Sequence, residues 1–342
     1  MKLARIHRHG GPEALVYEEA ADPQIRPDQV LVRVRACALN HLDLFVRAGM
    51  PGVKIGMPRV LGSDIAGEVV AVGELCQRVE RGWRVLLAPG LSCRQCEACF
   101  SGMDNMCRRY SVFGYAIDGG NAEFVAAPEY SVVRIPDDCG FDEAAAAPLV
   151  TLTAWHMLFT RARLQPGEDV LVLAASSGVG SCAIQIAKMF QCRVIATAGG
   201  EEKLARARDL GADHVIDHYQ QDIAAEVKKI TGKRGVDVVV EHVGVATWKH
   251  SMGALAPNGR LVTCGATTGY DAAIDLRYLF TKQYSVLGSF MGTLGELHTA
   301  LKFVFRKQVR PVIDCVYPLA EIQDAHRRLE DKRQFGKIIL HP

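Results

Sequence analysis

Four cysteines lie close together in the sequence, and their spacing suits a metal site. Cys93, Cys96, Cys99 and Cys107 have the pattern Cys-x2-Cys-x2-Cys-x7-Cys. Four thiolates at this spacing can close tetrahedrally around Zn²⁺, and an all-cysteine shell leaves no open position for water or substrate. We therefore expect one structural zinc ion, holding a loop that has little apolar content of its own. An iron–sulfur cluster and free thiols are the alternatives that ligand type leaves open.

A second chemical motif follows an apolar run. Residues 170–190 read VLVLAASSGVGSCAIQIAKMF, so an expected strand leads through Ser177, Gly178, Val179 and Gly180 into an expected helix. Glycines let the backbone approach a pyrophosphate, and a helix N-terminus presents unpaired N–H groups to it. Because strands and helices alternate on both sides of it, we expect this loop to bind a dinucleotide.

The end of the next expected strand indicates which dinucleotide. Proteins that bind NAD usually carry an acidic residue there for the ribose 2′-hydroxyl, whereas this chain has Ala198, followed by small residues including Gly200. Small residues leave room for a 2′-phosphate, and Lys203 could pair with it, as could His218 at the end of the next strand. The sequence therefore favours NADP(H) over NAD(H), and we interpret Glu201-Glu202 as a favourable first turn of a helix.

Composition bounds the class of protein. The chain has 342 residues and a mass of 37.3 kDa, which suggests about two domains. A hydrophobic content of 49% argues against disorder, and a net charge of +2 without a basic run argues against nucleic-acid binding. The longest apolar stretch, Val170–Ala175, is too short to span a bilayer. An odd count of 11 cysteines and no apolar leader lead us to expect a soluble cytoplasmic protein that does not bind membranes.

The elements that position these motifs fall into two patterns. Residues 1–140 are mostly short β runs, such as Val30–Ala36 (VLVRVRA), Ile65–Val72 and Trp83–Ala88, separated by turn signals. Short strands at this spacing favour a compact barrel-like domain.

From residue 141 the pattern changes to strands that alternate with helices. The apolar runs VLVLA and VDVVV fit strands buried on both faces, so we expect an α/β fold with a parallel, doubly wound sheet. Helices are expected over 142–149, 153–161, 183–190, 201–210, 223–231, 295–306 and 319–328, and strands over 170–173, 193–197, 215–216, 236–240, 260–264, 285–290, 312–316 and 337–340.

With these motifs in place, the whole chain resembles the medium-chain dehydrogenase/reductase superfamily, the group of zinc alcohol dehydrogenases and quinone oxidoreductases. The most specific parts are the four-cysteine lobe, the loop at 178–180, the glycine-rich stretch Gly62–Gly73 and the terminal strand Gly336–Ile339. The resemblance implies a GroES-like β-barrel catalytic domain over 1–150 with a structural zinc lobe at 93–107, a Rossmann NADP-binding domain over 151–290, and a C-terminal return to the first domain over 291–342.

The resemblance also implies further cofactor contacts. Thr153 resembles the family's nicotinamide-contacting threonine, and Gly265 belongs to the same cofactor site. Ser289 and Phe290 follow the last Rossmann strand, where the family's backbone holds the carboxamide.

The departures from the family concern its catalytic zinc, which zinc alcohol dehydrogenases hold with a Cys, a His and a second Cys. The first position is Asn40 here, the second is Ser63, and the region of the third, 148–150, reads Pro-Leu-Val. Cys37 lies three residues before Asn40, and His41 is a single imidazole, so neither makes a replacement site. We therefore expect the structural zinc to be present and the catalytic zinc to be absent.

Residues 40–49 (NHLDLFVRAG) resemble instead the quinone oxidoreductases, which reduce quinones or activated C=C bonds with NADPH and no metal. Without a Lewis acid, hydrogen-bond donors must stabilise the charge that develops as hydride arrives. We expect Asn40 to donate its amide N–H to the substrate oxygen or the nicotinamide carboxamide, with His41 and Ser63 as further donors or proton sources. The structural alternatives are that Asn40 caps a turn, His41 faces solvent and Ser63 fills space.

Nearby side chains are given structural roles. We expect Asp43 and Arg47 to form a structural pair. Phe45, Tyr115 and Trp155 are candidates to line the pocket, although packing is the commoner role of an aromatic residue.

Three functions stay open at this point. The first is an NADPH-dependent, metal-free quinone or enone reductase acting on a small molecule. The second is an alcohol or aldehyde dehydrogenase, and the third is a cofactor-binding protein with little turnover. The apolar edge strand expected over Tyr284–Phe290 predicts a homodimer, with a homotetramer as the alternative.

Overall fold

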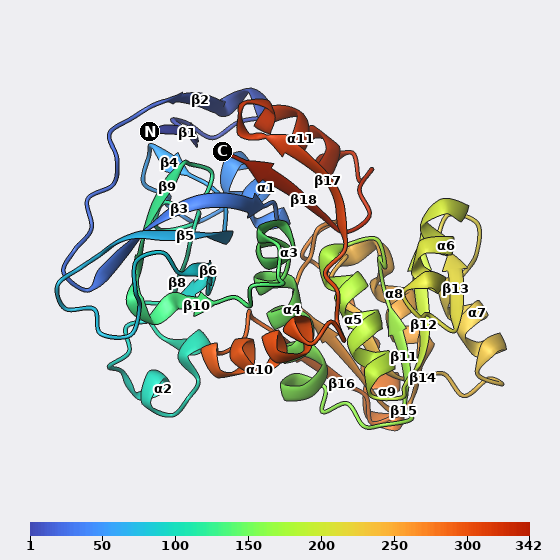
Figure 1. Cartoon of the computed structure of the whole chain (residues 1–342). Helices are drawn as coiled ribbons and strands as arrows, with labels where there is room; N and C mark the ends of the chain where they lie inside the picture. The colour runs from blue at the N-terminus through green and yellow to red at the C-terminus, as the bar shows by residue number, and fades with distance from the viewer. The chain divides into compact units, whose positions relative to one another are not determined.

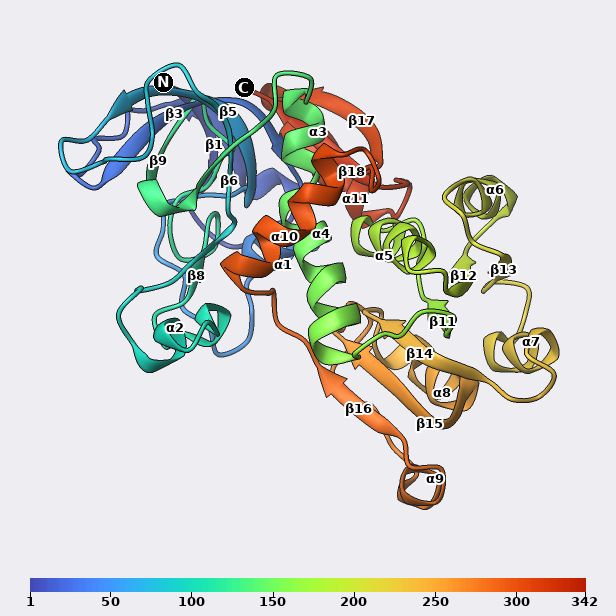
Figure 2. The same cartoon turned by 60° about the horizontal axis from the view of Figure 1, so that its bottom comes forward.

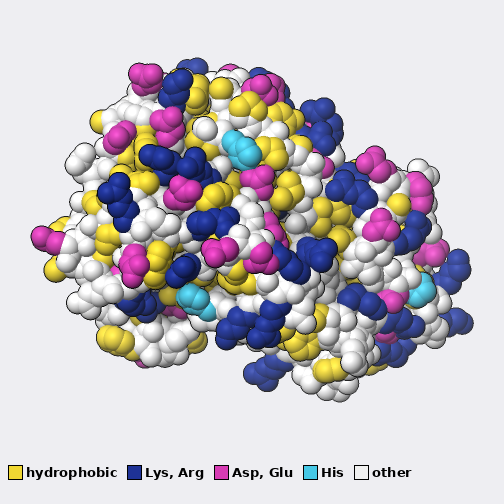
Figure 3. Space-filling view, in the orientation of Figure 1, with side chains coloured by type: hydrophobic (Ala, Val, Ile, Leu, Met, Phe, Trp, Pro, Cys, Tyr) yellow, Lys and Arg dark blue, Asp and Glu magenta, His cyan; other side chains and the backbone are white.

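The computed structural model describes residues 1–342, and the chain divides into two compact units. The first comprises Met1–Leu149, Thr293–Phe305 and Pro311–Pro342, and the second comprises Val150–Gly292 and Arg306–Arg310. None of the helices combines the length and the apolar run that a membrane span needs. Basic and acidic side chains are both present over the face drawn in Figure 3, in a chain whose net charge is +2.

The main sheet of the first unit combines strands from both ends of the chain (Figure 1). Its path runs β10-β6-β5-β3-β18-β17, and β9 pairs with β3. The bounds are β3 (Gln29–Ala38), β5 (Asp64–Val72), β6 (Arg84–Leu87), β9 (Phe124–Pro128), β10 (Val132–Arg134), β17 (Ile313–Pro318) and β18 (Lys337–His341). The expected GroES-like β domain is confirmed.

Strand β3 follows directly from its sequence. Val30, Val32 and Val34 are buried in one apolar core, whereas the residues between them are partly or fully exposed. The period-two pattern over 30–36 is therefore confirmed. Because β3 pairs with β5, β9 and β18, it brings distant parts of the chain to one place.

Smaller elements complete the first unit. Two further sheets have the orders β2-β1-β4 and β7-β8. The strands are β1 (Lys2–Ile6), β2 (Leu15–Glu19), β4 (Arg59–Val60), β7 (Gly90–Leu91) and β8 (Ser111–Val112), and the helices are α1 (His41–Ala48), α2 (Glu97–Phe100), α3 (Phe141–Ala146), α10 (Leu294–Phe305) and α11 (Ile322–Glu330).

Helix α1 was not expected from the sequence. The side chain of Asp43, at the third helical position, accepts a hydrogen bond from the backbone N–H of Asn40 at 2.7 Å. This is one half of a capping box, in which an N-cap residue and an acidic residue three positions later satisfy free N–H groups. The pattern Asn-x-x-Asp was therefore the signal for a helix start in this β-rich segment.

The second unit contains the expected parallel sheet, and the predicted α/β class is confirmed. Six strands have the order β13-β12-β11-β14-β15-β16, and every neighbouring pair is parallel. Their bounds are β11 (Asp169–Val172), β12 (Arg193–Ala198), β13 (His214–Asp217), β14 (Val236–Glu241), β15 (Leu255–Thr263) and β16 (Ser285–Gly288).

Helices cover both faces of this sheet (Figure 2). The chain adds strands from β11 outward to β13 on one side, and then from β14 to β16 on the other side of β11. Because the crossovers are right-handed, this reversal of direction puts α5 and α6 on one face of the sheet and α7 and α8 on the other. The helices are α4 (Pro148–Trp155), which continues as a π-helix over His156–Arg161, α5 (Gly178–Met189), α6 (Glu201–Asp209), α7 (Ile223–Ile230), α8 (Val245–Ala254) and α9 (Leu276–Thr281).

Two helix starts differ from the expected ones for local reasons. Helix α4 begins at Pro148 instead of 153, because proline has no N–H to lose and its φ suits the first helical position. Helix α5 begins at Gly178 instead of 183, because the Ser177 side chain caps it. The two motif glycines therefore lie in the first turn of the helix.

The prediction that Asp43 pairs with Arg47 is wrong, because each has other partners. Asp43 is engaged in the cap of α1, whereas the buried Arg47 guanidinium contacts Glu330 and donates to the Nδ1 atom of His326 at 3.2 Å. Burial, followed by the charge of Arg47, lowers the pKa of His326 to about 3. The imidazole is therefore neutral and accepts the proton that Arg47 offers, which joins α1 to α11.

We expect the Arg47→Ala variant to lose about 2 kcal/mol or more of stability, because it removes a buried guanidinium and leaves its partners unsatisfied. The matched control is Arg327→Ala, which breaks the exposed pair with Asp324 and is expected to change stability by about 0.5 kcal/mol or less. Urea unfolding followed by circular dichroism measures both. Equal shifts for the two variants would contradict the assigned role of Arg47.

Candidate functional site

The nucleotide loop is fixed to the neighbouring strand. Ala174, with φ of +48°, donates its N–H to the Thr197 hydroxyl at 3.1 Å, and the Ala175 N–H donates to the Thr197 carbonyl at 2.8 Å. A positive φ at a residue with a side chain is uncommon and persists where the surroundings hold it. These hydrogen bonds therefore hold the loop against β12 in this conformation.

Ser177 and the glycines form the start of α5. The Ser177 Oγ atom accepts a hydrogen bond from the Gly180 N–H at 2.8 Å. A Cβ atom at Gly180 would lie 2.4 Å from the Ala174 carbonyl oxygen, so only glycine fits. Ser177, Gly178 and Val179 are partly exposed. An accessible helix N-terminus with a close backbone fits a pyrophosphate, so the residues present suit a dinucleotide.

The region predicted to select the cofactor lies at the end of β12. Ala198 is buried, and Gly200 takes φ of +82° as the N-cap of α6. A Cβ atom at Gly199 would meet the ring of Tyr219 at 2.1 Å, and Tyr219 packs edge-on against the His218 ring with centroids 4.5 Å apart.

The first turn of α6 carries the other predicted selectivity residue. Lys203 is half-buried there. Glu201 pairs with Arg208 at 2.7 Å on the exposed side of α6, which agrees with its interpretation as a helix residue.

Of the remaining predicted cofactor residues, three lie at the carboxyl ends of neighbouring strands and one, Thr153, lies in helix α4. Gly265 follows β15, and its Cβ would lie 3.1 Å from the His242 carbonyl oxygen. Ser289 extends β16 by donating its N–H to Thr263 at 2.8 Å, and its own hydroxyl is buried without a partner. Phe290 is exposed and Thr153 is buried. The carboxyl ends of parallel strands are where ligands bind in such sheets.

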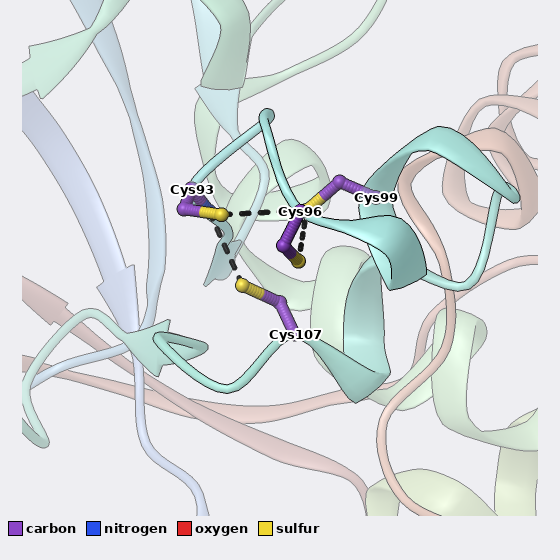
Figure 4. Close-up of side chains that lie close together, drawn as sticks. All are labelled: Cys93, Cys96, Cys99 and Cys107. Carbon is purple, nitrogen blue, oxygen red and sulfur yellow. Dashed lines mark hydrogen bonds between the residues drawn. The ribbon is translucent and has the colours of Figure 1, made fainter.

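The four cysteines form a compact thiol cluster (Figure 4). Their sulfur atoms point toward one another and all lie within 4.8 Å of one another. Cys93 lies 3.9 Å from Cys99, and Cys96 lies 3.5 Å from Cys99. The Cys107 sulfur accepts N–H groups from Cys93 at 3.4 Å and Arg109 at 3.3 Å, which stabilises a thiolate. This donor set fits a tetrahedral zinc ion.

Backbone hydrogen bonding also favours the charged form of one of these thiols. The N–H of Gln95, more than any other contact, lowers the pKa of Cys93 to about 6. The pKa of the neighbouring Cys96 thiol is instead raised to about 11, so the geometry of the four sulfur atoms is the evidence for a metal ligand set.

A buried polar cluster lies where three strands end together. Asn40 follows β3, Asp64 begins β5 and Lys337 begins β18, and β3 pairs with both of the other strands. The Lys337 ammonium donates to Asp64 Oδ2 at 2.9 Å and to Asn40 Oδ1 at 2.5 Å. The Asn40 amide donates to Asp64 Oδ2 at 2.9 Å, and Asp64 Oδ1 accepts from the Leu149 N–H at 2.8 Å.

Asp43 holds this cluster against the segment that carries Ser63. Its carboxylate accepts the N–H groups of Asn40 at 2.7 Å and Gly62 at 2.9 Å. Burial raises the pKa of Asp43 to about 6, against the opposing effect of those two N–H groups. Ser63 itself is fully buried, and its hydroxyl has no hydrogen-bond partner. The structure thus brings Asn40 and Ser63 to one cluster.

Sequence reasoning missed Asp64 and Lys337 as members of the cluster. Asp64 is fully buried and Lys337 is 3% exposed, although charged residues are rarely buried unless they are paired. The usable signal was a charge at the start of an apolar strand in each case, in Ser63-Asp64-Ile65 and Gly336-Lys337-Ile338.

The other residues considered for this site have ordinary surroundings. His41 is half-buried in the first turn of α1, 6.5 Å from the Phe45 ring, and Tyr115 packs on an apolar core. Trp155 packs against Phe159 and Phe190 in the second unit. Cys37 is fully buried, and burial raises the pKa of its thiol, so it is not a reactive group.

Comparison with known proteins matches a known family to a segment of each unit. Residues 26–137 match the family described as alcohol dehydrogenase GroES-like domain, and residues 178–306 match the zinc-binding dehydrogenase family. A quinone oxidoreductase of Pseudomonas aeruginosa is 32% identical over 350 residues, with 100% of this chain and 99% of that protein covered.

Two alcohol dehydrogenases are also similar. The alcohol dehydrogenase of Geobacillus stearothermophilus is 32% identical over 343 residues, with 99% of each chain covered. A solved structure described as an NAD-dependent alcohol dehydrogenase superposes with a TM-score of 0.97 at 43% identity, covering 100% of both chains. From its two family domains and these full-length relatives, the chain belongs to the medium-chain dehydrogenase/reductase superfamily of oxidoreductases.

Proposed function

We propose that this protein is an NADPH-dependent reductase of quinones or other activated C=C and carbonyl compounds that works without a catalytic zinc. The observation that carries the proposal is the buried contact of Lys337 with Asn40 and Asp64. The family resemblance gives Asn40 and Ser63 the positions of catalytic zinc ligands. Neither residue is a usual zinc ligand, and a cation of the protein itself lies against Asn40.

Electrostatics makes this arrangement unfavourable for a divalent ion. An ion bound to Asp64 would lie near the Lys337 ammonium, which is 2.9 Å from the same carboxylate. At about 4 Å and an effective dielectric constant of about 20, a divalent and a monovalent cation repel by on the order of 8 kcal/mol. The ammonium therefore competes with a metal for this carboxylate.

The proposed class of substrate follows from the hydrogen-bond donors that the protein does not fully use within itself. The bound reduced nicotinamide supplies a hydride, and the acceptor gains negative charge that must be stabilised. The Ser63 hydroxyl has no partner, and one of the two Asn40 amide bonds, to the Ala38 carbonyl, is long at 3.4 Å. We infer that these two groups donate to the substrate oxygen, with His41 as a further proton source. Such neutral donors suit enolate or hydroquinone anions better than a localised alkoxide.

We infer that NADP(H) is the preferred cofactor. Ala198 stands where an acidic residue would bind the ribose 2′-hydroxyl, and Lys203 and His218 lie in the two segments that follow β12 and β13. The name of the 43% identical structure, an NAD-dependent alcohol dehydrogenase, supports NAD(H) and alcohols as the second candidate. Kinetics with both cofactors separates the two.

We propose that the cluster of Cys93, Cys96, Cys99 and Cys107 binds one structural zinc ion. The sulfur donor set and the N–H groups aimed at Cys107 support this. The seven other cysteines are free thiols, which supports a reducing compartment such as the cytoplasm.

We propose that two copies of the chain form a homodimer through strand β16, with a homotetramer as the alternative. Strand β16 is at the edge of the six-stranded sheet, and an open edge is a template for pairing with another chain. Tyr278, Phe280 and Phe290, in α9 and just after β16, are exposed aromatic side chains that such an interface would cover.

The first test is steady-state kinetics on one purified sample. We expect NADPH oxidation with 1,4-benzoquinone or a small enone. For these acceptors, kcat/KM with NADPH should be at least about tenfold above kcat/KM for primary alcohols with NADP⁺. It should also be about tenfold above kcat/KM for the same acceptors with NADH. Alcohol oxidation that needs added zinc would support the second candidate. Tight NADPH binding without turnover would support a binding protein.

The second test removes the metal of the thiol cluster. We expect about one zinc ion per chain by elemental analysis, and loss of that ion in Cys96→Ser with faster proteolysis inside residues 93–107, because structural zinc contributes folding energy. Cys76→Ser, at a partly exposed cysteine outside the cluster, is the control and should retain the metal. Two ions per chain in the wild type would contradict the proposal of a single, structural zinc.

The third test concerns Lys337. We expect Lys337→Met to lower kcat by about tenfold or more, because Asn40 loses the donor that orients it, while the nucleotide Kd changes by about threefold or less. Lys337→Arg should recover part of the rate, since it keeps the charge. Lys54→Met, at an exposed lysine of the same unit, should have no effect on either quantity.

If Lys337→Met fails to fold, the Lys337→Met/Asp64→Asn double variant removes both charges and restores neutrality. Wild-type kcat in the folded double variant would show that the cluster does not act in the reaction.

A further inference from the structure

His242 is a half-buried histidine beside the nucleotide loop that no part of the proposed mechanism uses. It follows the last residue of β14, and its Nε2 atom lies 3.0 Å from the Oγ atom of Ser177. The same Oγ atom accepts the Gly180 N–H at 2.8 Å. One serine oxygen therefore faces two nitrogen atoms.

The other nitrogen of the ring indicates which tautomer is present. His242 Nδ1 is buried and has no hydrogen-bond partner. Burial lowers the pKa of His242, so the ring is neutral and carries one proton. A buried N–H without an acceptor is unfavourable, and orphaned N–H groups are rarer in proteins than unsatisfied acceptors. The proton therefore belongs on Nε2, which donates to Ser177.

This assignment determines the direction of the serine hydroxyl. A hydroxyl oxygen has two acceptor sites and one proton to donate. Gly180 and His242 together fill both acceptor sites of Ser177, so its proton is left to point away from them. The loop residues Ser176–Val179 are partly exposed, and the first turn of α5 presents its free N–H groups at the same place.

A second network keeps His242 in position. The preceding residue, Glu241, is fully buried, and its carboxylate accepts the N–H groups of Val243 at 2.7 Å and Gly244 at 3.1 Å, together with the hydroxyls of Thr247 and Ser251. The Glu241 carboxylate makes these hydrogen bonds within its own turn and none to His242, although its charge opposes the lowering of the His242 pKa. The turn places the imidazole against Ser177.

We propose that His242 is a positioning residue for the nucleotide, which donates from Nε2 to Ser177 and so makes the Ser177 hydroxyl a donor to the cofactor's pyrophosphate. The proposal rests on the proposed binding of a nicotinamide dinucleotide at this loop. In the opposite tautomer, Ser177 would donate to His242 and have no proton left for a phosphate. The two arrangements differ in an observable way.

The tautomer is measured directly in the unliganded full-length protein. Nitrogen-15 NMR of the labelled histidines, with the His242→Phe variant to assign the signals, distinguishes a protonated from an unprotonated nitrogen. We expect Nε2 to be protonated and Nδ1 unprotonated at neutral pH. A protonated Nδ1 would overturn the proposal and would leave the proposed enzyme function untouched.

The effect on the nucleotide is measured by calorimetric titration with NADP⁺ and NADPH. We expect Ser177→Ala to weaken binding by about tenfold, as a charge-assisted hydrogen bond is worth about 1.5–3 kcal/mol, and His242→Phe to weaken it by about threefold to tenfold. The double variant should bind no more weakly than Ser177→Ala, because both changes remove one interaction.

Two controls complete this experiment. His250→Phe, at an exposed histidine of α8, should bind as the wild type does, and thermal unfolding without nucleotide should show that all variants fold. His242→Phe binding within about twofold of wild type, or additive effects in the double variant, would overturn the proposal. Wild-type protein that binds neither NADP(H) nor NAD(H) would overturn the proposed function itself, before any variant is compared.

Discussion

The ammonium of Lys337 lies almost wholly out of water, between the carboxylate of Asp64 and the amide oxygen of Asn40. A buried charge of this kind is tolerated only when its partners satisfy it, so the three residues constrain one another. They come from the starts or ends of three paired strands, β3, β5 and β18. The closing strand of the chain is therefore part of the site, and the first unit cannot form that site from its N-terminal residues alone.

In the second unit, hydrogen-bonded side chains also constrain one another. Ser177 accepts hydrogen bonds from Gly180 and, in the proposed tautomer, from His242 beside the start of α5, and Glu241 is satisfied within its own turn. Hydrogen bonds that hold a loop in place reduce the ordering entropy that is lost when an anion binds. In both units, hydrogen-bonded polar residues fix the direction in which a side chain presents its donors, and in the proposed function this direction is what a hydride acceptor or a phosphate would meet.

Periodicity predicted most of the fold, and capping accounts for much of the rest. The apolar runs of β11 and β14 and the alternation of β3 were visible in the sequence, because they depend on burial alone. The start of α5 at Gly178 and the whole of α1 depended on single side chains, Ser177 and Asp43. The sequence suggested that Asp43 and Arg47 pair. The Asp43 carboxylate instead caps α1 by accepting a hydrogen bond from the Asn40 N–H. The contact of Lys337 with Asn40 could not be predicted, because it depends on the pairing of strands about 300 residues apart.

If Asn40 and Ser63 occupy the positions of catalytic zinc ligands, as we propose, the same couplings would oppose a metal site introduced by a single substitution. A cysteine at position 40 would remove the amide donor of Asp64 and the acceptor of Lys337 together, and would leave a buried cation with one partner fewer. A histidine at position 63 would place an imidazole next to Asp64, which pairs with the same ammonium, in space that is fully buried. Each substitution alone would leave Lys337 in place, and its ammonium would repel an incoming ion. The thiol cluster shares no residue with this network, so the proposed structural ion would be independent of the proposed chemistry at Asn40.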